Sequence, residues 1–474
     1  MRLGSGTGVG VDRRRRSGPE RPRGLAPGAT EGDIMGRFRW VAALGAVALA
    51  TAMTAGSAVA QSGSPAKEPL RATDVGVSPT EIRVGVIADT GSQFAPGLFQ
   101  GAVDAVKAWA QYTNEVEGGL AGRKVVVDVY DSGLDPVKSR NAIIEACAKD
   151  FVIVGTSALF LNNVDDLLTC PDGRKVATGL PDFPVLTTEV AHQCSPVSHG
   201  INPPIIDCAT KDQKPQTYRG SVGATNYYLK KYGKKNLHGL FVYPSDVKAA
   251  KNTQVPAFKA QQDAGIKQDA TFDISATAQQ SAYTPLVQAI KDKQSTYARH
   301  GGNDAGTIAL MKEAKLQGVN SVKVWDCSLQ CYDEDILKAP ETEGLYVWSL
   351  FLPFDEANQN KMLKNYSKYV GKKADGFGAQ AWASGILVRD VVNQIVEENG
   401  PNGLTRAAML QTVDGITDFT ADGMLGNTNP GERVPSPCYV LTQVKKGKFV
   451  RVWPEKKGTF DCKNELYEIK LDLN

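Results

Sequence analysis

Residues 81–154 alternate between apolar runs and amphipathic segments, and this alternation limits the possible folds more than any other feature. Ile82–Ala88 is a near-continuous apolar run, which is typical of a parallel strand buried on both faces. Leu98–Glu115 repeats alanine and valine at helical spacing. The next segments are predicted as a strand, a helix and a strand, at Val125–Tyr130, Val137–Ala148 and Phe151–Val154. Strands separated by helices predict βαβ units and a mostly parallel, doubly wound sheet.

The same pattern continues through the rest of the chain. Further strands are predicted at Pro184–Thr187, Leu237–Tyr243, Ala270–Ile274, Val322–Trp325 and Leu345–Ser349. Further helices are predicted at Ala224–Tyr232, Lys248–Ala264, Tyr283–Lys291, Thr307–Gln317, Glu356–Val370 and Gln380–Asn399. Cys438–Val444 and Lys448–Trp453 are predicted to form an antiparallel hairpin. These strands and helices are too many for one doubly wound sheet, and we therefore expect an α/β protein of two lobes.

Residues 35–60 have the anatomy of a secretory signal. Arg37 and Arg39 provide the basic start, a short apolar run follows, and Ala58-Val59-Ala60 supplies small residues before a cleavage point. The apolar run is too short for a membrane span. Residues 1–34 are interpreted as upstream or disordered sequence, and we expect the protein to be exported to the periplasm or the extracellular space.

The charge of the exported part is close to balanced. Residues 1–60 carry 9 of the 54 Lys and Arg and 4 of the 51 Asp and Glu, so the remainder carries 45 basic and 47 acidic side chains, a net charge of −2. This balance gives no reason to expect nucleic acid or an anionic membrane as a partner. Residues 61–77 are predicted as a polar linker, and the 414 residues from position 61 onward are enough for two cores.

The eight cysteines agree with export, because an even number in a secreted chain indicates disulfides. A zinc site is not indicated, since no cysteines have C-x-x-C spacing and the four histidines are scattered. We predict that neighbours in sequence pair with one another, although the sequence leaves the connectivity open. The predicted pairs are Cys147 with Cys170, Cys194 with Cys208, Cys327 with Cys331, and Cys438 with Cys462.

Asp89-Thr90-Gly91-Ser92 matches the motif of an aspartic protease, and Asp131-Ser132-Gly133 resembles a second copy. An exported aspartic-type hydrolase is therefore one alternative. However, both motifs end predicted parallel strands, where Asp and Gly more often form the turn into a helix. The sequence from position 61 onward has no nucleophile elbow, zinc-protease motif or phosphate-binding loop. We predict a binding protein without a cofactor, and not an enzyme.

A series of short motifs occurs along the chain in a fixed order. They are Thr80–Gly85, Gly101-Ala102, Gly118–Arg123, Asp131 with Asp135-Pro136, Val152–Ala158, Phe183–Leu186 and Glu343–Tyr346. With these motifs, the chain from about Val77 to Trp453 resembles a type I periplasmic solute-binding protein of the branched-chain amino acid kind. Proteins of this family are the capture component of an ABC importer. A bond between Cys147 and Cys170 also fits the resemblance.

The resemblance implies two doubly wound, mostly parallel-sheet lobes joined by a three-strand hinge, with the ligand in the cleft. We expect the chain to cross between lobes near Gly220, Leu350 and Pro435. The first lobe is expected to comprise residues 78–220 plus 353–434, and the second 221–352 plus 435–470. Each predicted disulfide would then lie within one lobe and leave the hinge free to move.

Ligands of doubly wound sheets lie beyond the carboxyl ends of the strands, and the candidate residues are chosen there. In the first lobe, Thr156, Ser157, Ala158, Thr187 and Thr188 are expected to hold a carboxylate, with helix capping as the alternative for each. In the second lobe the candidates are Tyr243, Asp246, Asn303, Asp304 and Asp326. The family typically uses an acid for the ligand ammonium, and Asp304 and Asp326 are the candidates for it here.

Three aromatic residues are further candidates for the cleft. Phe94 could pack on an apolar part of the solute, or simply anchor its loop. Phe377 and Trp382 could gate the cleft, with burial in the core as the alternative.

The predicted function is capture of a small polar solute, such as an amino acid, an amide, urea or a small carboxylate, by a monomer that delivers it to a membrane permease. An extracellular ligand-sensing module is the second alternative.

Overall fold

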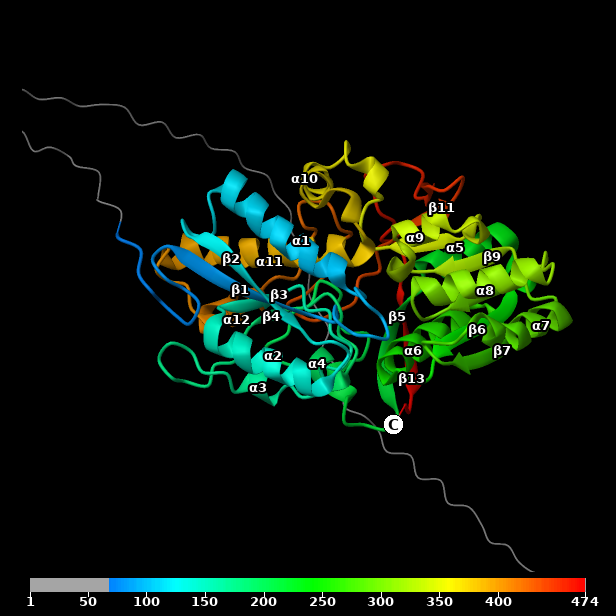
Figure 1. Cartoon of the computed structure of the whole chain (residues 1–474), viewed down its shortest axis with the longest axis horizontal. Helices are drawn as coiled ribbons and strands as arrows, with labels where there is room; N and C mark the ends of the chain where they lie inside the picture. Colours follow the sequence, from blue (N-terminus) through cyan, green and yellow to red (C-terminus); the bar gives the residue numbers. More distant parts are fainter. Residues whose placement is uncertain (1–67, 474) are drawn as a thin grey trace, which may run out of the picture. The chain divides into compact units, whose positions relative to one another are not determined.

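A computed structural model of the protein describes residues 68–473. The predictions for residues 1–34, for the signal at 35–60 and for the start of the linker lie outside the described residues. Two mixed α/β halves make up this part of the chain, in which strands alternate with helices (Figure 1). The prediction of an α/β fold with mostly parallel sheets is confirmed.

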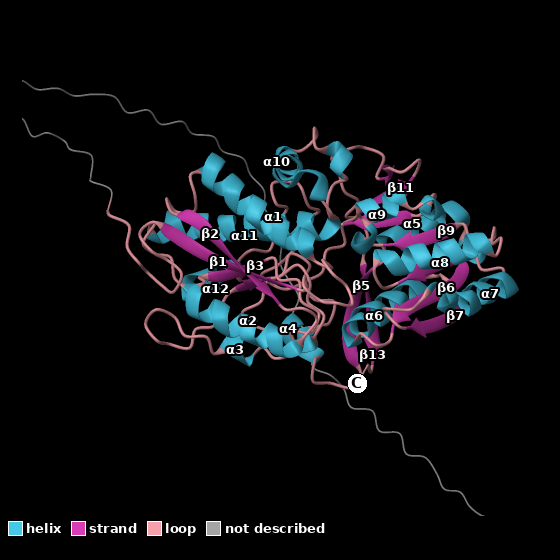
Figure 2. Ribbon diagram, in the orientation of Figure 1, coloured by secondary structure: helices cyan, strands magenta, loops and turns pink. Residues whose placement is uncertain are grey.

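The first sheet has the order β2-β1-β3-β4, and all its strands are parallel. Its strands are β1 (Glu81–Ala88), β2 (Lys124–Asp131), β3 (Val152–Val154) and β4 (Asp182–Phe183). Helices cover both faces of this sheet (Figure 2), which agrees with the prediction that its first strand is buried on both sides. Val84 and Val86 pack in the same cluster as α1 (Gln100–Tyr112) and α11 (Gly376–Asn399). Ile87 packs with α2 (Pro136–Lys149) and α3 (Asp165–Leu168).

Helices α1 and α11 approach closely because Gly385 has no side chain. A Cβ atom at Gly385 would lie 2.3 Å from the ring of Trp109, which is fully buried on α1. The other helices of this part of the chain are α4 (Val190–Gln193), α10 (Lys361–Val370) and α12 (Arg406–Val413). The core around the first sheet is therefore built from two separate parts of the chain, one before β5 and one after β10.

The second sheet has the order β12-β11-β10-β9-β8-β6-β7. Its parallel strands are β6 (His238–Pro244), β7 (Lys267–Ile274), β8 (Tyr297–His300), β9 (Val324–Cys327) and β10 (Tyr346–Ser349). The predicted hairpin is confirmed as β11 (Val440–Val444) and β12 (Phe449–Trp453), which extends the sheet antiparallel to β10. One face packs on α5 (Gly223–Tyr232) and α6 (Lys248–Ala264), and the other on α7 (Thr284–Lys293) and α8 (Asp304–Leu316).

The chain passes between the two sheets at three places. It first reaches the second sheet through β5 (Gln216–Ser221), which pairs with the last strand, β13 (Leu466–Leu471). After β10 it returns toward α10–α12, and Phe351 bridges to Leu425 beside this return. It then leads from Leu425 into β11. Between β9 and β10 lies the short helix α9 (Glu334–Lys338).

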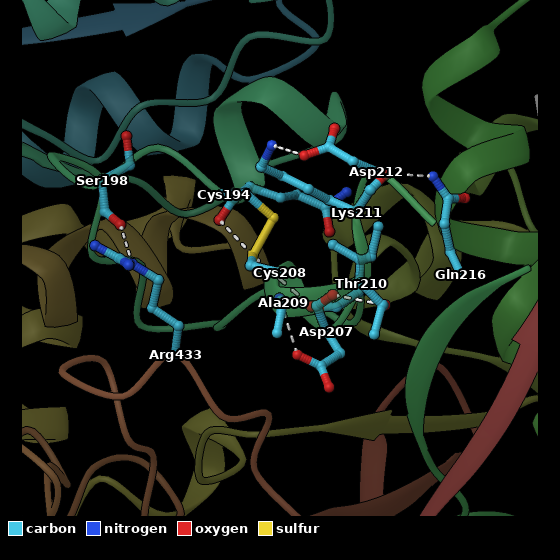
Figure 3. Close-up of a disulfide and its surroundings, with 12 residues drawn as sticks. Cys194, Ser198, Asp207, Cys208, Ala209, Thr210, Lys211, Asp212, Gln216 and Arg433 are labelled. Atoms are coloured by element: carbon cyan, nitrogen blue, oxygen red, sulfur yellow. Dashed lines mark hydrogen bonds and ion pairs between the residues drawn. A yellow bond between two sulfur atoms is a disulfide. The ribbon is translucent and has the colours of Figure 1, made fainter. Parts of the chain in front are cut away.

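All four predicted disulfide pairs are present. The bond between Cys194 and Cys208 fixes the long loop that precedes β5 (Figure 3). In the same view the Arg433 Nε donates to the Ser198 carbonyl oxygen over 3.2 Å, so residues more than two hundred positions apart hold this loop. The described residues contain no free cysteine.

The structure differs from the predicted elements in a few places. The fourth strand is Asp182–Phe183 and not Pro184–Thr187, which forms the loop after it. Strands β5, β8 and β13 and helices α3, α4, α9 and α12 were not predicted. Residues 68–77 were assigned to a linker, yet Asp74 and Val77 form a bridge and the Asp74 carboxylate accepts from the Gly173 and Arg406 backbone amides. Within residues 68–473, every helix is too short or too polar to span a bilayer.

Candidate functional site

The carboxyl ends of the first sheet are organised around Asp89, which follows β1 directly. Its carboxylate is fully buried and accepts from the Ser132 hydroxyl at 2.7 Å, the Leu134 amide at 2.7 Å and the Leu159 amide at 2.8 Å. These donors belong to the loops that follow β2 and β3. One carboxylate therefore holds together the three loops at the edge where a ligand of a parallel sheet would bind.

Asp131, at the end of β2, is held by a separate set of donors. It accepts from the Thr90 and Gly91 amides, at 3.0 and 2.9 Å, and from the Gly133 amide at 3.0 Å. Burial alone would raise its pKa, but these backbone N–H groups lower it below its usual value. Among the described residues no hydrogen bond joins the carboxyl groups of Asp89 and Asp131. They are loop anchors here and not a pair that shares one proton, as a protease would need.

The hydroxyl groups predicted to hold a ligand carboxylate are engaged inside the protein. The Thr156 hydroxyl donates to Asp182 at 2.6 Å, and the Ser157 hydroxyl donates to the Gly155 carbonyl at 3.0 Å. Ser157 also continues the sheet, because its backbone bridges to Ala88 and to Leu186. Thr156, Ser157 and Ala158 are all fully buried. These three residues therefore support the edge of the sheet from its buried side, and their side chains are not exposed to a ligand.

Asp182 links this edge to the loop that contains the Cys194–Cys208 disulfide. Besides Thr156, it contacts His192 Nε2 at 2.6 Å and accepts from the Ser198 hydroxyl at 2.9 Å. His192 is fully buried, and its Nδ1 has no hydrogen-bond partner among the described residues. Asp182 was not predicted as a site residue, although a lone acidic residue in a short apolar segment after β3 was a signal in the sequence.

Thr187 and Thr188 lie in the loop after β4. Thr188 is buried, and its hydroxyl donates to the Leu159 carbonyl at 2.9 Å. Its own carbonyl accepts from Gln193 Nε2 at 3.2 Å and from Asn252 Nδ2 at 3.5 Å. Asn252 lies on α6, beside the second sheet. The predicted residue Thr188 therefore contacts the second half of the molecule, while Thr187 is partly exposed.

Asp326, near the end of β9, is fully committed to internal partners. It accepts from the Tyr297 hydroxyl at 2.6 Å, the Tyr228 hydroxyl at 2.9 Å and Gln261 Nε2 at 3.1 Å, and Arg299 Nη1 lies 3.5 Å away. Burial raises the pKa of this carboxyl, against the opposing effect of Arg299 and the three donors. Only 1% of the residue is exposed, so its carboxylate stabilises the interior of the second half and does not face a ligand.

Asp304 and Asp333 form a second acidic pair, at the starts of α8 and α9. Burial raises the pKa of Asp304, and burial together with the nearby charge of Asp304 raises the pKa of Asp333 to about 7. Both residues follow strands of the second sheet, β8 and β9, at their carboxyl ends. Asp304 was predicted, whereas Asp333 was missed because it follows the disulfide turn and not the strand itself.

The remaining candidates of the second half lie around the same edge. Asn303 caps α8 by accepting from the Gly306 amide at 3.0 Å. Asp246 is exposed and accepts from the Ser275 hydroxyl at 2.6 Å and from the Ala276 amide at 2.8 Å, which ties the ends of β6 and β7 together. Tyr243 is partly buried beside α5 and α6. Nothing among the described residues groups three or more possible metal ligands.

The three aromatic candidates have different positions. Phe94 is 81% exposed at the tip of the loop between β1 and α1. Phe377 packs at the edge of the core, with its ring 4.8 Å from that of Phe99. Trp382 is fully buried beside Tyr112 and Tyr366. Of the three, only Phe94 is placed to contact a molecule outside the core.

The two halves also touch beside the Cys327–Cys331 turn. The Gly376 amide, at the start of α11, donates to the Tyr332 carbonyl at 3.0 Å, and the Phe354 amide donates to the Tyr332 hydroxyl at 3.0 Å. Tyr332 follows the disulfide turn and lies beside Asp333. The structure thus brings the acidic pair of the second half close to the segment that joins it to the first.

Replacing Asp333 with asparagine is expected to stabilise the protein at pH 8 by about 4 kcal/mol, and to have little effect at pH 4. A raised pKa means that the folded protein retains a proton that the unfolded chain releases. The cost of ionising Asp333 is therefore absent below pH 4, grows toward its pKa of about 7 and is constant above it. Asparagine removes that cost and keeps the oxygen that caps α9 by accepting from the Ile336 amide.

The measurement is urea unfolding of both proteins at several pH values. Asp335→Asn is the matched control, because Asp335 is exposed and its ion pair with Lys338 lies at the surface. We expect it to change stability by less than about 0.5 kcal/mol at either pH. A gain for Asp333→Asn that is equal at pH 4 and pH 8 would contradict the assignment.

Comparison with known proteins agrees with this architecture. The model of the family described as periplasmic binding protein matches residues 81–448. A search of curated proteins finds no match. Among solved structures, a fatty acid ABC transporter substrate-binding protein from Thermomonospora curvata is 16% identical, covers 84% of this chain and 95% of its own, and superposes with a TM-score of 0.61. A leucine-binding protein from Thermotoga maritima is 13% identical, with 78% and 97% covered and a TM-score of 0.59.

Proposed function

Because the chain belongs to the periplasmic binding protein family, we propose that it is the extracytoplasmic solute-binding component of an ABC importer. The observation that carries the proposal is the pairing of two α/β halves. The strand ends of one half carry backbone amides and the partly exposed Thr187, and those of the other carry Asp304 and Asp333. The solved structures that share the fold are named for solutes as different as a fatty acid and leucine, so the solute is argued from the residues. These residues favour a small polar solute.

The proposed mechanism is closure of the two halves around the solute. We assign residues 78–220 plus 353–434 to one lobe and 221–352 plus 435–470 to the other. The three connections between the sheets would then act as the hinge. A small cavity lies among them, lined by Ser221, Trp348 and Tyr439, one residue beside each connection. Closure requires that the solute contact both lobes, since only differential affinity shifts the equilibrium.

We assign different chemical roles to the two lobes. The loops that Asp89 organises would present backbone amides and Thr187 to a carboxylate or carbonyl group of the solute, with Phe94 against its apolar part. Asp304 and Asp333 would accept hydrogen bonds from an ammonium or amide group. Asp326 is not assigned this role, because three donors and Arg299 already occupy its carboxylate. Phe377 and Trp382 are assigned to the core and not to a gate.

A thermal-unfolding screen tests the proposal. A cognate amino acid, amide, urea or small carboxylate at 100 times its dissociation constant should raise the free energy of unfolding by about 2.7 kcal/mol. Asp304→Asn should lower the affinity for an amine-bearing solute by about tenfold or more, as expected when a hydrogen bond to a charged group is lost. Asp246→Asn is the control that should keep the affinity, because Asp246 is bound to its own loop. The proposal fails if no solute of these classes stabilises the protein.

A further inference from the structure

The balanced charge of the chain conceals a separation between its two halves. Residues 221–352 plus 435–470 carry 23 Lys and Arg against 17 Asp and Glu. Residues 78–220 plus 353–434 carry 20 Lys and Arg against 27 Asp and Glu. The excess positive charge therefore belongs to the part of the chain that builds the second sheet and its helices.

The fold gathers the lysines of this half at one end. In a parallel sheet, every connecting helix runs back from the carboxyl ends of the strands to their amino ends. The amino edge, defined here as the starts of β6–β10 with the adjoining helix ends and the β11–β12 turn, thus receives the last residues of α5, α7 and α8. The exposed lysines of its strand layer and turn are Lys267, Lys323, Lys445, Lys446 and Lys448.

Helices on both faces of the sheet extend this edge into a broad surface. Lys234 and Lys235 follow α5 on one face, while Lys293 ends α7 and Lys315 lies near the end of α8 on the other face. Seven strands lie side by side in the sheet, which gives the edge a length of about 29 Å at the usual strand spacing. The lysines thus come from the strand layer and from the helices on both of its faces, and not from a single row.

These lysines lack acidic partners. Among the described residues, no ion pair joins Lys234, Lys235, Lys293, Lys315 or any of the five lysines of the strand layer and turn to a carboxylate. Acidic residues at the same end are fewer. Asp263 pairs with Lys259, Asp269 pairs with His238, and the Glu343 carboxylate accepts from the Lys446 amide at 2.8 Å. Asp292 is exposed beside Lys293. The lysines outnumber these acids, so the amino edge presents a net positive charge to its surroundings.

An exposed leucine lies within this basic surface. Leu316, the last residue of α8, is 70% exposed and follows Lys315 directly. Single exposed apolar residues are common on protein surfaces, and one that lies among cations also suits the boundary between lipid headgroups and acyl chains.

We propose that the amino edge of the second sheet is a docking surface for an anionic phospholipid bilayer. Lysines near such a surface each contribute attraction that falls off within a Debye length. A bilayer fits better than a linear polyanion, because the lysines come from all three layers of the fold and the exposed Leu316 lies beside them. The acidic first half would be repelled, so the protein would bind with the second half toward the lipid. This inference goes beyond the proposed function and does not depend on it.

Vesicle co-sedimentation tests the proposal with the compact unit Lys67–Asn474, which contains every described element. We expect it to bind phosphatidylglycerol-containing vesicles at low salt and to be released at high salt, and not to bind pure phosphatidylcholine vesicles. Lys234→Gln/Lys235→Gln/Lys448→Gln should lower the partition coefficient by about fivefold per lysine, or about a hundredfold in total. Leu316→Ser should lower it further at any salt concentration.

The matched control is Lys361→Gln/Lys364→Gln/Lys372→Gln, which removes three exposed lysines from α10 and the turn after it, in the first half. It should bind vesicles like the unchanged protein. Equal loss in both triple variants would overturn the assignment of the surface, as would failure to bind anionic vesicles at low salt. The proposal would also be overturned if soluble polyphosphate bound as tightly as vesicles and Leu316→Ser had no effect. The ligand of this surface would then be a linear polyanion and not a bilayer.

Discussion

Replacing Glu356 with glutamine is expected to lower the free energy of unfolding by about 3–5 kcal/mol. Glu356 is fully buried and binds Arg451 of β12 through both carboxylate oxygens, with Arg451 Nη2 2.6 Å from Oε2. The Gly458 amide also donates to Oε2 at 2.8 Å. Glutamine has nearly the same shape but no charge, so it leaves the Arg451 guanidinium, with only 4% of its side chain exposed, without a counter-ion.

The neighbouring pair provides the control for this experiment. Asp355 binds Lys457 at 3.2 Å, but both side chains are more than half exposed. Asp355→Asn should therefore cost less than about 1 kcal/mol, because water screens the pair and solvates the partner that remains. Urea unfolding of the two variants under identical conditions measures the difference. Similar losses for both variants would mean that Glu356 and Arg451 contribute no more than a surface pair.

Replacing Arg406 with methionine is expected to lower the free energy of unfolding by about 3–4 kcal/mol. Arg406 is fully buried at the start of α12 and donates to the Pro171 carbonyl at 2.7 Å and the Cys147 carbonyl at 2.9 Å. It also donates to the Asp150 carbonyl, and its Nη1 lies 2.9 Å from Cys170 Sγ. Methionine fills much of the space but leaves these buried carbonyl groups without a donor.

Two further variants distinguish the hydrogen bonds of Arg406 from its volume. Arg406→Lys should recover only part of the loss, because an ammonium cannot reach carbonyl groups in several directions as a planar guanidinium does. Arg71→Gln serves as the control, since the side chains of Arg71 and its partner Glu68 are 64% and 61% exposed and the loss should cost less than about 1 kcal/mol. If Arg406→Met unfolds at the same urea concentration as Arg71→Gln, the network does not stabilise α12.

The first sheet could be predicted from sequence because its signals are local. The strand expected at Ile82–Ala88 is β1, Glu81–Ala88, and the helix expected at Val137–Ala148 is α2, Pro136–Lys149. Strand β8 was missed because Tyr297–His300 contains Arg299 and His300, which no strand rule favours. Arg299 is buried only because Asp326 lies opposite it in the neighbouring strand. That compensation depends on pairing between strands that are distant in sequence.

The sequence rule placed candidate residues at the strand ends, but it could not give their hydrogen-bonding partners. The rule that ligands bind beyond the carboxyl ends of parallel strands selected Thr156 and Asp326 correctly as residues at those ends. It could not reveal that Asp182 takes the hydrogen bond of Thr156, or that two tyrosines occupy Asp326. A side chain's free or engaged state depends on neighbours that the fold supplies. For the same reason, Asp333 emerged as a candidate only when its burial and its nearness to Asp304 were known.

By itself, the sequence determined the α/β class and the family, because apolar periodicity and ordered motifs are properties of neighbouring residues. It left the pairing of the eight cysteines open, and the structure confirms the predicted pairing of neighbours. Only the tertiary structure decided which polar groups are engaged and where charge collects. A near-zero sum over the sequence gave no sign of the basic amino edge, since summation discards position. Helices that all return to the same edge of a sheet bring their terminal lysines together, and that gathering exists only in the folded protein.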